Sequence, residues 1–557
     1  MKFENILADI GGFGRFQIFI FIILCFPRVT LPWHFLLHNF ISAVPTHHCA
    51  ISDPDNVDIF GNLTAHQKLV VSIPMELSGT FSTCKMFSEP QFQLLSNSSM
   101  EAGNAAATVE CQYGWVYDTS IFSSTVATEW DMVCNKKGLN QASATFFFIG
   151  VMIGAIVFGG LSDKFGRKPM LLASFILSIV FGLAATFSVS YVMFAIMRSL
   201  TGFGLTGISI ISICLTIEWV DIEHRTFIGV FGSMVWSTGN MMLALIAYLI
   251  RDWRWLLLAV TSPLVICCIV WWWIPESARW LLANGKGHEA HTYLSKCAKM
   301  NNRKDASSKI TPEILSRIVT VEGKNKNYTY LDLVRTPKMR KLAICTGIIW
   351  YMFGVAHTYY GISLNITGFG LNMYLTQFIY GAIEVPAKLL VYYMLNRIGR
   401  RQSQAWSLLL TGVCLGINLF LPSSMVLVRS VIAILGKGLS EASFTIVYLY
   451  TAELYPTVVR QNGIGYSSFV ARLGVSAAPL IMLLEDIWKL LPQTIFCSVA
   501  ILAGFTAFFL PETQNLRLPE TIEDVEQTRK RTIAISAEER TDISLKPLNC
   551  DLKENVS

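Results

Sequence analysis

The chain has 557 residues, of which 53% are hydrophobic and 15% are charged. Soluble domains carry about 25% charged residues, so this composition excludes an ordinary soluble globular protein and indicates a chain surrounded by lipid. The formal net charge of +6 would suit nucleic-acid binding, but the basic residues lie in short loops beside apolar segments, where they orient a membrane protein instead. We therefore expect the lipid bilayer as a partner and no nucleic acid.

The first apolar segment runs from about residue 16 to residue 44 and is interrupted by polar groups. Residues 1–15 lack the basic start and the small-residue cleavage site of a removable signal peptide, so we expect this segment to be retained as a membrane span. Polar groups inside a span are expensive and usually face a water-filled cavity or another helix. His34 and Asn39 are therefore candidate substrate-binding residues, whereas Arg28 suits snorkelling or a structural ion pair equally well.

Residues 45–138 form a long polar segment that contains cysteines and N-glycosylation sequons. The cysteines are Cys49, Cys84, Cys111 and Cys134, and the sequon asparagines are Asn62 and Asn97. Together they indicate an extracellular, oxidised loop. Two disulfides are expected, and the sequence leaves all three pairings open. The other cysteines lack metal-ligand spacing and are interpreted as small apolar packing residues, so we predict no metal and no other cofactor.

Five further spans are expected in the first half, at residues 140–161, 169–189, 191–215, 226–249 and 255–274. Each is close to the roughly 20 residues that a helix needs to cross the hydrocarbon layer. The first two are joined by a short turn, GGLSDKFGRK at 159–168, whose glycines permit a backbone reversal. Its basic residues hold the turn on the cytoplasmic face, and Asp163 and Arg167 are candidate gating residues.

Three motifs of the first half return in the second half, in the same order and at nearly the same offset. The turn returns as NRIGRR at 396–401, the Glu218 and Arg225 pair returns as Glu453 and Arg460, and PES at 275–277 returns as PET at 511–513. Chance matches between common loop residues would not keep one offset. A parallel repeat of six spans is the arrangement of the major facilitator fold. The candidate gating residues therefore include Arg397, Arg400, Glu453 and Arg460 beside Asp163, Arg167, Glu218 and Arg225.

The remaining chain divides into three parts. Residues 275–340 are polar and basic and predict a cytoplasmic central segment with short helices. Six more spans are expected near 341–363, 374–396, 403–421, 427–451, 462–484 and 491–510. The predicted divisions are an N-terminal half at 1–274, the central segment at 275–340, a C-terminal half at 341–511 and a polar tail at 512–557, with both termini cytoplasmic.

Candidate substrate residues are the ionisable side chains within spans. Lys388 follows Glu384 by four positions and Lys437 precedes Glu441 by four, so each pair suits self-neutralisation across one helical turn and substrate binding equally well. Arg472 has no acidic neighbour in its span. A guanidinium at this depth needs an anion, water or a remote partner, and its planar fork suits carboxylate, sulfate or phosphate. Arg472 is therefore the leading candidate.

Aromatic residues concentrate in the same part of the chain. The candidates are Trp350, Tyr359 and Tyr360 in the seventh span and Phe444 in the tenth. Single aromatic residues in spans usually pack or face lipid. Beside a cationic centre, however, they would hold the rings of an amphipathic anion and leave its charge to Arg472 and Lys388. We find no set of residues for hydrolytic catalysis, so no enzymatic activity is predicted.

Several motifs resemble the solute carrier 22 family of organic ion transporters over essentially the whole chain. These are DKFGR at 163–167, the Glu218 and Arg225 pair, PESARW at 275–280, THHC at 46–49 and EWDMVC at 129–134. GFGRFQ at 12–17, PTHH at 45–48, YYG at 359–361, VPAK at 385–388 and ARLG at 471–474 are similar to the organic anion branch. Cation-transporting relatives carry an acidic residue where this chain has Arg472, and Glu441 departs from many anion-selective relatives.

The resemblance implies an all-α membrane protein with the major facilitator fold, built from 12 transmembrane helices in two six-helix halves. It implies sodium-independent, polyspecific transport of small organic anions by alternating access, either facilitative or in exchange for a counter-anion. Dicarboxylates, urate, prostaglandins, nucleobase carboxylates, cyclic nucleotides and anionic drugs are the implied candidates. The implied protein is a monomeric transport unit in the plasma membrane, basolateral in epithelia. The alternatives are an organic cation or zwitterion transporter and a proton-coupled sugar porter of the same fold.

Overall fold

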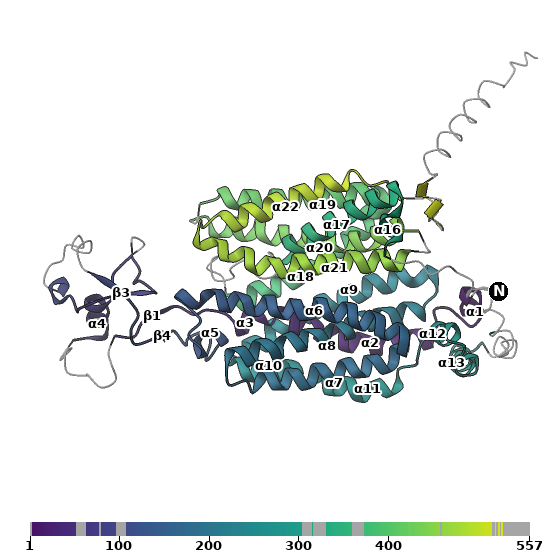
Figure 1. Ribbon diagram of the computed structural model, residues 1–557, viewed down its shortest axis with the longest axis horizontal. Coiled ribbons are helices and arrows are strands. Elements are labelled where there is room, and N and C mark those ends of the chain that lie inside the picture. The colour runs from purple at the N-terminus through teal and green to yellow at the C-terminus, as the bar shows by residue number, and fades with distance from the viewer. Residues whose placement is uncertain are drawn as a thin grey trace, which may run out of the picture.

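A computed structural model describes residues 3–51, 63–76, 79–95, 107–303, 315, 330–358, 372–422, 424–456, 459–514, 519, 522–523 and 525–526. Its main body is a bundle of long helices that run along one common direction (Figure 1). Ten helical segments of the described chain are long and apolar enough to cross a membrane. Figure 1 shows the helices of the first half, purple to teal, lying beside those of the second half, green to yellow. The sequence expectation of a helical membrane protein is therefore confirmed.

The first half supplies six spans. They are α2 (Arg15–Leu36), α6 (Lys137–Phe165), α7 (Arg167–Thr186), α8 (Tyr191–Glu218), α9 (Ile222–Leu249), and a sixth built from α10 (Trp253–Thr261), α11 (Pro263–Val270) and the 3-10 turn η5 (Trp271–Trp273). The sixth span is divided at Pro263, which has no N–H for the helical hydrogen bond. The first span is shorter than the expected 16–44. Its helix α2 ends at Leu36, and the short α3 (His38–Ile41) carries the span on to Ile41.

Small residues let the helices of this half approach closely. A side chain at Gly150 of α6 would collide with the backbone carbonyl of Ser199 on α8, and one at Gly154 would collide with the backbone of Phe203. Such close approach is how membrane helices associate without a hydrophobic driving force between them. The glycines of these spans are therefore packing positions.

The second half supplies the other six spans, of which Pro337–Thr358 and Leu491–Ala507 are not among the ten segments counted above. They are α17 (Pro337–Thr358), α18 (Met373–Arg397), α19 (Arg400–Phe420), α20 (Val426–Leu454), α21 (Arg460–Met482) and α22 (Leu491–Ala507), with the 3-10 turn η8 (Leu483–Asp486) after α21. Each begins within four residues of the start expected from the apolar runs, because charged, polar or turn-forming residues interrupt the hydrophobic stretch before each run. Two six-helix halves are thus present, as expected.

The two halves meet through α9 against α18 and α6 against α21. Gly381 of α18 lies so close to Met241 and Ser237 of α9 that a side chain there would collide with Met241. At the start of α18, the ring of Tyr374 stacks on Phe40 at a centroid distance of 5.8 Å. These contacts close the bundle on the side that carries residues 45–138.

The segment at that end forms a small separate unit, at the left of Figure 1. Its antiparallel pairs are β1 (His47–Cys49) with β4 (Trp115–Tyr117) and β2 (Lys85–Phe87) with β3 (Thr108–Glu110). Its short helices are α4 (Ala65–Ser72) and η2 (Phe92–Leu95), whereas α5 (Val126–Glu129) lies against the bundle and η4 (Cys134–Lys136) leads into α6. The disulfides are Cys49–Cys111 and Cys84–Cys134, which confirms the expectation of two and settles the pairing.

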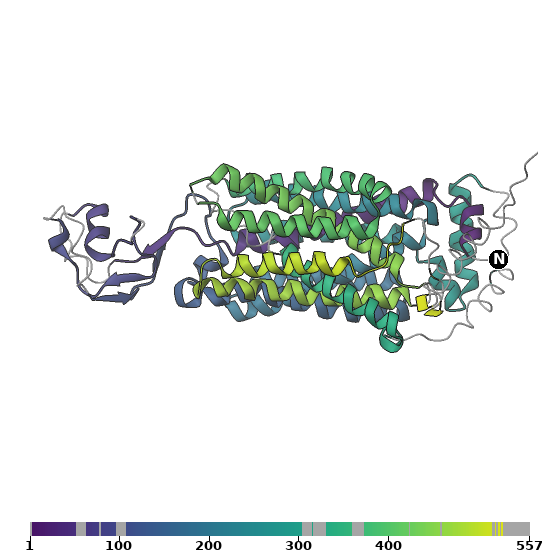
Figure 2. The ribbon, with the colours of Figure 1, turned by 90° about the horizontal axis from the view of Figure 1, so that it is seen from above.

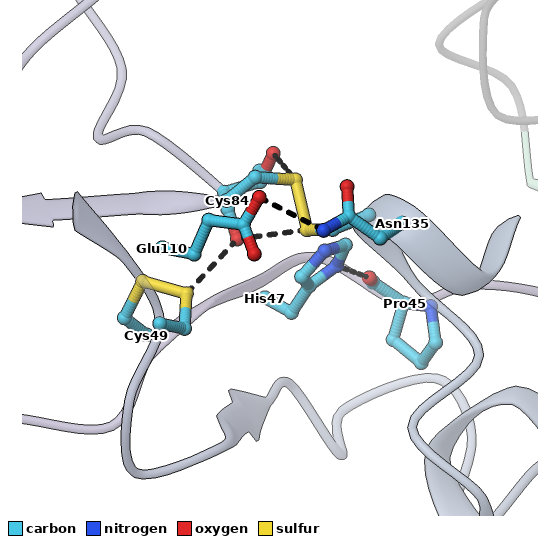
Figure 3. Close-up of a disulfide and its surroundings, with 9 residues drawn as sticks. Pro45, His47, Cys49, Cys84, Glu110 and Asn135 are labelled. Carbon is cyan, nitrogen blue, oxygen red and sulfur yellow. Dashed lines mark hydrogen bonds between the residues drawn. A yellow bond between two sulfur atoms is a disulfide. The ribbon is translucent and has the colours of Figure 1, made fainter.

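Figure 3 shows how these bridges are surrounded. The side-chain amide of Asn135, next to Cys134, donates to the carboxylate of Glu110 at 2.9 Å, so the neighbours of both disulfides also bond to each other. Asn62 and Asn97, the predicted glycosylation sites, lie outside the described residues.

Short helices gather at the opposite end of the bundle (Figures 1 and 2). They are α1 (Phe3–Asp9), α12 (Ala278–Ala283), α13 (Gly287–Met300) and α16 (Asp332–Arg335). Asn301 joins α13 to the start of α2, because its carboxamide accepts from the backbone N–H of Phe16 at 3.0 Å and donates to the carbonyl of Gly11 at 2.9 Å. The central segment and the disulfide-bonded loop therefore lie at opposite ends of the spans, as their charge and cysteine content predict.

Candidate functional site

The turn between α6 and α7 holds an ion cluster. Gly166 has a φ of 105°, which permits the reversal. The guanidinium of Arg167 contacts Asp163 at 2.9 Å and Glu218, at the end of α8, at 3.0 Å. Three consecutive spans of the first half are thus tied together at one end.

Glu276 completes this cluster from the segment that follows the sixth span. Its carboxylate accepts from the backbone N–H groups of Arg167 and Lys168, each at 3.0 Å, and therefore caps the N-terminus of α7. Burial raises the pKa of the Glu276 carboxyl, while these backbone bonds act in the opposite direction. Glu276 belongs to the repeated PES motif, but the sequence expectations do not include it among the gating residues. Its recurrence as Glu512 was the available signal.

The second half repeats this cluster except at the position of Asp163, which Asn396 occupies. Gly399 has a φ of 95°, Arg400 contacts Glu453 at 3.1 Å, and Glu512 accepts from the backbone N–H of Arg400 at 2.8 Å. Arg400 thus matches Arg167, and Glu453 matches Glu218. The duplication inferred from motif spacing has a direct structural counterpart.

The other gating candidates lie differently. Arg397 is exposed, and its guanidinium lies over the ring of Tyr393 at 5.8 Å, outside the second cluster. Arg460 donates to the backbone carbonyl of Tyr455 at 3.3 Å, within its own half, and has a further interaction. The side chain of Arg225 lies outside the described part of the structure.

Four buried charges meet in the middle of the second half. We call Glu384 and Lys388 of α18 together with Lys437 and Glu441 of α20 the charge quartet. Lys388 lies 3.4 Å from Glu384 and 3.8 Å from Glu441, and Lys437 lies 3.4 Å from Glu384 and 2.8 Å from Glu441. Each lysine therefore contacts both carboxylates, so the two local pairs form one cross-helix network.

The charge quartet also bonds to the first half. Glu384 accepts from the Ser237 hydroxyl at 2.7 Å and from the Asn240 amide at 3.1 Å, both on α9. Lys388 donates to the backbone carbonyl of Ser233 at 2.9 Å and to Ser237 at 2.6 Å. Gln377 of α18 in turn donates to Asn240. Sequence reasoning missed these α9 residues, since uncharged polar side chains in a span give no distinctive signal.

Burial follows from these contacts. The side chain of Lys388 is 1% exposed and that of Lys437 is 7% exposed. In this conformation both lysines face carboxylates, and neither presents a surface to a substrate. A substrate role for them is a prediction that requires another conformation.

Arg472 lies elsewhere, beside an aromatic cluster made by Trp350, Phe444 and Tyr448. The Tyr448 ring packs edge-to-face on Trp350 at 4.6 Å and on Phe444 at 4.9 Å. Tyr448 is 42% exposed and lies within electrostatic range of Arg472. Within the part of the chain that the structure describes, Arg472 makes no ion pair and remains partly exposed. A cation and an accessible aromatic surface thus adjoin one another.

The candidates of the first span lie away from this surface. His34 is completely buried, and its backbone carbonyl accepts from Arg198 of α8 at 3.2 Å. The Arg198 guanidinium also lies over the Phe147 ring at 4.5 Å. Asn39 is half-buried and has an interaction partner, and Arg28 packs against Gly232 of α9.

Two further aromatic candidates, Tyr359 and Tyr360, lie outside the described residues. Of the substrate candidates selected from the sequence, the structure therefore brings Trp350 and Phe444 together around Tyr448, with Arg472 in electrostatic range of that tyrosine, and brings Lys388 and Lys437 together in the charge quartet. Tyr448 joins the first group and was not selected.

Comparison with known proteins places this architecture in a family. The sugar (and other) transporter family matches residues 85–524. Solute carrier family 22 member 7 of Homo sapiens is 48% identical over 540 residues, which cover 95% of this chain and 96% of that protein. Solute carrier family 22 member 6 of Danio rerio is 39% identical over 571 residues and covers 100% of both chains.

Solved structures agree on the fold. The xylose transporter of E. coli in an inward-open conformation gives a TM-score of 0.57 at 14% identity, covering 92% of this chain and 99% of that chain. A partially occluded inward-open form gives 0.58 at 15% identity over 90% of this chain and 99% of that chain. The expected major facilitator fold is confirmed. Because its relatives are 39–48% identical over nearly the full length, the chain belongs to solute carrier family 22, as its motifs indicated.

Proposed function

We propose that this protein is a polyspecific secondary transporter of small organic anions. The observation that carries the proposal is Arg472, a partly exposed guanidinium midway along a span, which makes no ion pair among the described residues and lies within electrostatic range of Tyr448. A guanidinium away from bulk water favours an anionic partner, and its two parallel N–H groups match a carboxylate. Trp350, Phe444 and Tyr448 offer apolar area for the organic part of the same molecule.

Broad selectivity follows from this division of roles. One charge contact fixes the anionic group, while aromatic faces accept many ring shapes without a demanding set of hydrogen bonds. The lysines of the charge quartet are proposed to join the site when α9 and α18 separate, since Lys388 then loses its bonds to Ser233 and Ser237. His34 and Asn39 are proposed to line the site only in such another conformation.

Transport is proposed to proceed by alternating access of the two halves without sodium, as facilitated passage or anion exchange. The α9–α18 contacts close the bundle on the side of residues 45–138, whereas Tyr448 is exposed near the other end of α20. With the disulfide-bonded loop outside, these contacts support an inward-facing state. Both termini and residues 275–340 are then cytoplasmic, and the protein is proposed to act as a monomer in the basolateral plasma membrane.

Uptake into vesicles that carry the purified protein tests this proposal. A labelled aromatic carboxylate, an organic cation and a hexose should be offered separately, with protein-free vesicles as the background. We expect saturable uptake of the carboxylate in sodium-free buffer. Uptake of the hexose alone would favour the sugar porter alternative. The family match is compatible with that alternative, and the xylose transporter has the same fold. Uptake of the cation alone would favour the cation alternative.

A further inference from the structure

Glu441 of the charge quartet lies on the same face of α20 as two aromatic residues of the proposed site. Glu441, Phe444 and Tyr448 follow one another on α20 at spacings of three and four residues, so their side chains lie on successive turns of one face. Tyr448 is at the accessible end of this row and Glu441 is at its buried end. A substrate that enters past Tyr448 therefore approaches the charge quartet.

We propose that Glu441 determines which substrate charge the site accepts and makes the site selective for singly charged anions. This inference rests on the proposed function and narrows its substrate class. The charge quartet holds two ammonium groups and two carboxylates, and hence has no net charge. Glu384 accepts hydrogen bonds from Ser237 and Asn240, and Glu441 contacts both lysines.

Net charge acts on a bound substrate beyond its immediate contacts. Since the charge quartet contributes none, Arg472 leaves one positive charge at the aromatic site of the second half. A monoanion balances that charge. A dianion would bring a second negative charge, which lies uncompensated in surroundings of low dielectric constant and is therefore disfavoured.

Of the two carboxylates in the charge quartet, Glu441 is the better position for a test substitution. Glu384 also bonds to Ser237 and Asn240 of the opposite half, so its replacement would disturb the interface between the halves. Glu441 shares its helix with the aromatic row and contacts both lysines. Replacing it with glutamine retains the shape of the side chain and raises the charge of the quartet by one.

The test compares benzoate with phthalate, which share one ring and differ by one carboxylate. Uptake efficiency for both is measured at neutral pH in vesicles that carry the wild type, Glu441→Gln, Lys437→Gln or the double variant, with protein-free vesicles subtracted. The net charge of the quartet is then zero in the wild type, plus one in Glu441→Gln, minus one in Lys437→Gln and zero in the double variant. We expect Glu441→Gln to shift the efficiency ratio about tenfold toward phthalate and Lys437→Gln to shift it about tenfold toward benzoate. The double variant should return to the wild-type ratio.

The outcomes separate this inference from the proposed function. A ratio that is the same in all four proteins, or a double variant that behaves like Glu441→Gln, overturns the role of Glu441 while anion transport stands. Wild-type vesicles that take up neither anion refute the proposed function and the inference with it. If the Glu441→Gln protein does not reach the membrane, the opposite shift in Lys437→Gln and its reversal in the double variant decide the question.

Discussion

Among single residues, Arg472 has the clearest expected effect. Replacing Arg472 with alanine removes the guanidinium that adjoins Tyr448, and anion uptake efficiency should fall about tenfold, because a partly exposed pair is weakened by water. A fully desolvated pair would cost about 2–4 kcal/mol, or roughly thirtyfold to nearly a thousandfold. Initial rates of labelled anion uptake at equal surface abundance measure the effect.

The other Arg472 variants are controls for charge and shape. Arg472→Lys should recover only part of the activity, because a point charge replaces the bidentate fork. Arg472→Asp should abolish anion uptake and admit organic cations, because the same cavity then carries the opposite charge. Wild-type efficiency in Arg472→Ala for every tested anion would remove Arg472 from the site.

The sequence predicts these residues individually better than it predicts their surroundings. Arg472 is recognisable because a charge in an apolar run is unusual, and the local pairs at Glu384 and Glu441 follow from four-residue spacing. That the two pairs meet each other depends on how α18 packs against α20. His34 shows the same limit, since its polarity suggested a cavity whereas packing has buried it completely.

At the scale of helices, the α9–α18 contact is expected to set the balance between the two transport states. Asn240→Ala removes a buried donor to Glu384, which should weaken closure on the loop side about fivefold. The readout is the labelling rate of Met373→Cys, a buried position at the start of α18, by a membrane-impermeant maleimide. This rate should rise in the Asn240→Ala background.

A matched control lies on the same helix. Thr238 is exposed, and its hydroxyl bonds to the carbonyl of Met234 within α9, so Thr238→Ala should leave the labelling rate unchanged. Equal rates in the Asn240→Ala and Thr238→Ala backgrounds would show that the bond to Glu384 does not hold the halves together.

The turn clusters give a second prediction for the helices. Asp163→Asn should lower the maximal transport rate more than it changes half-saturation, because Asp163 contacts Arg167 at the helix ends and not in the aromatic site. The effect should be no more than a few-fold, since Asp163 is 68% exposed and exposed ion pairs contribute about 0–1 kcal/mol. Surface-expressed protein with an unchanged maximal rate and an altered half-saturation would contradict it.

The sequence predicts helix boundaries well where charged residues end an apolar run. It predicts them less well where the helical hydrogen bonding of the backbone is interrupted inside an apolar run. The repeated clusters at Gly166 and Gly399 were anticipated because their motifs keep one spacing. The division of the sixth span at Pro263 and the early end of α2 were not anticipated, since hydropathy measures transfer to lipid and not backbone hydrogen bonding.

For the whole molecule, the sequence predicts the two halves well and the loop poorly. Spans are long, apolar and periodic, and their order follows from the chain. The loop has short strands, and its disulfide pairing depends on which strands adjoin: β2, beside Cys84, pairs with β3, and Cys111 follows β3 by one residue yet bonds to Cys49. Spacing alone could not have chosen this pairing.

The orientation of the whole molecule is the last prediction. Residues 45–138 and the central segment lie at opposite ends of the spans, so fixing one of them in a compartment fixes the other (Figures 1 and 2). Disulfides form in oxidising compartments, and basic segments stay in the cytoplasm, so the loop should be extracellular. Glycosidase treatment of protein from eukaryotic cells should lower its mass, and changing Asn62 and Asn97 to glutamine should abolish that loss. The sequon at Asn327 in the central segment is the internal control, because it would be glycosylated only in the reverse orientation. A mass loss that survives the double change but disappears with Asn327→Gln would invert the topology and make the observed conformation outward-facing.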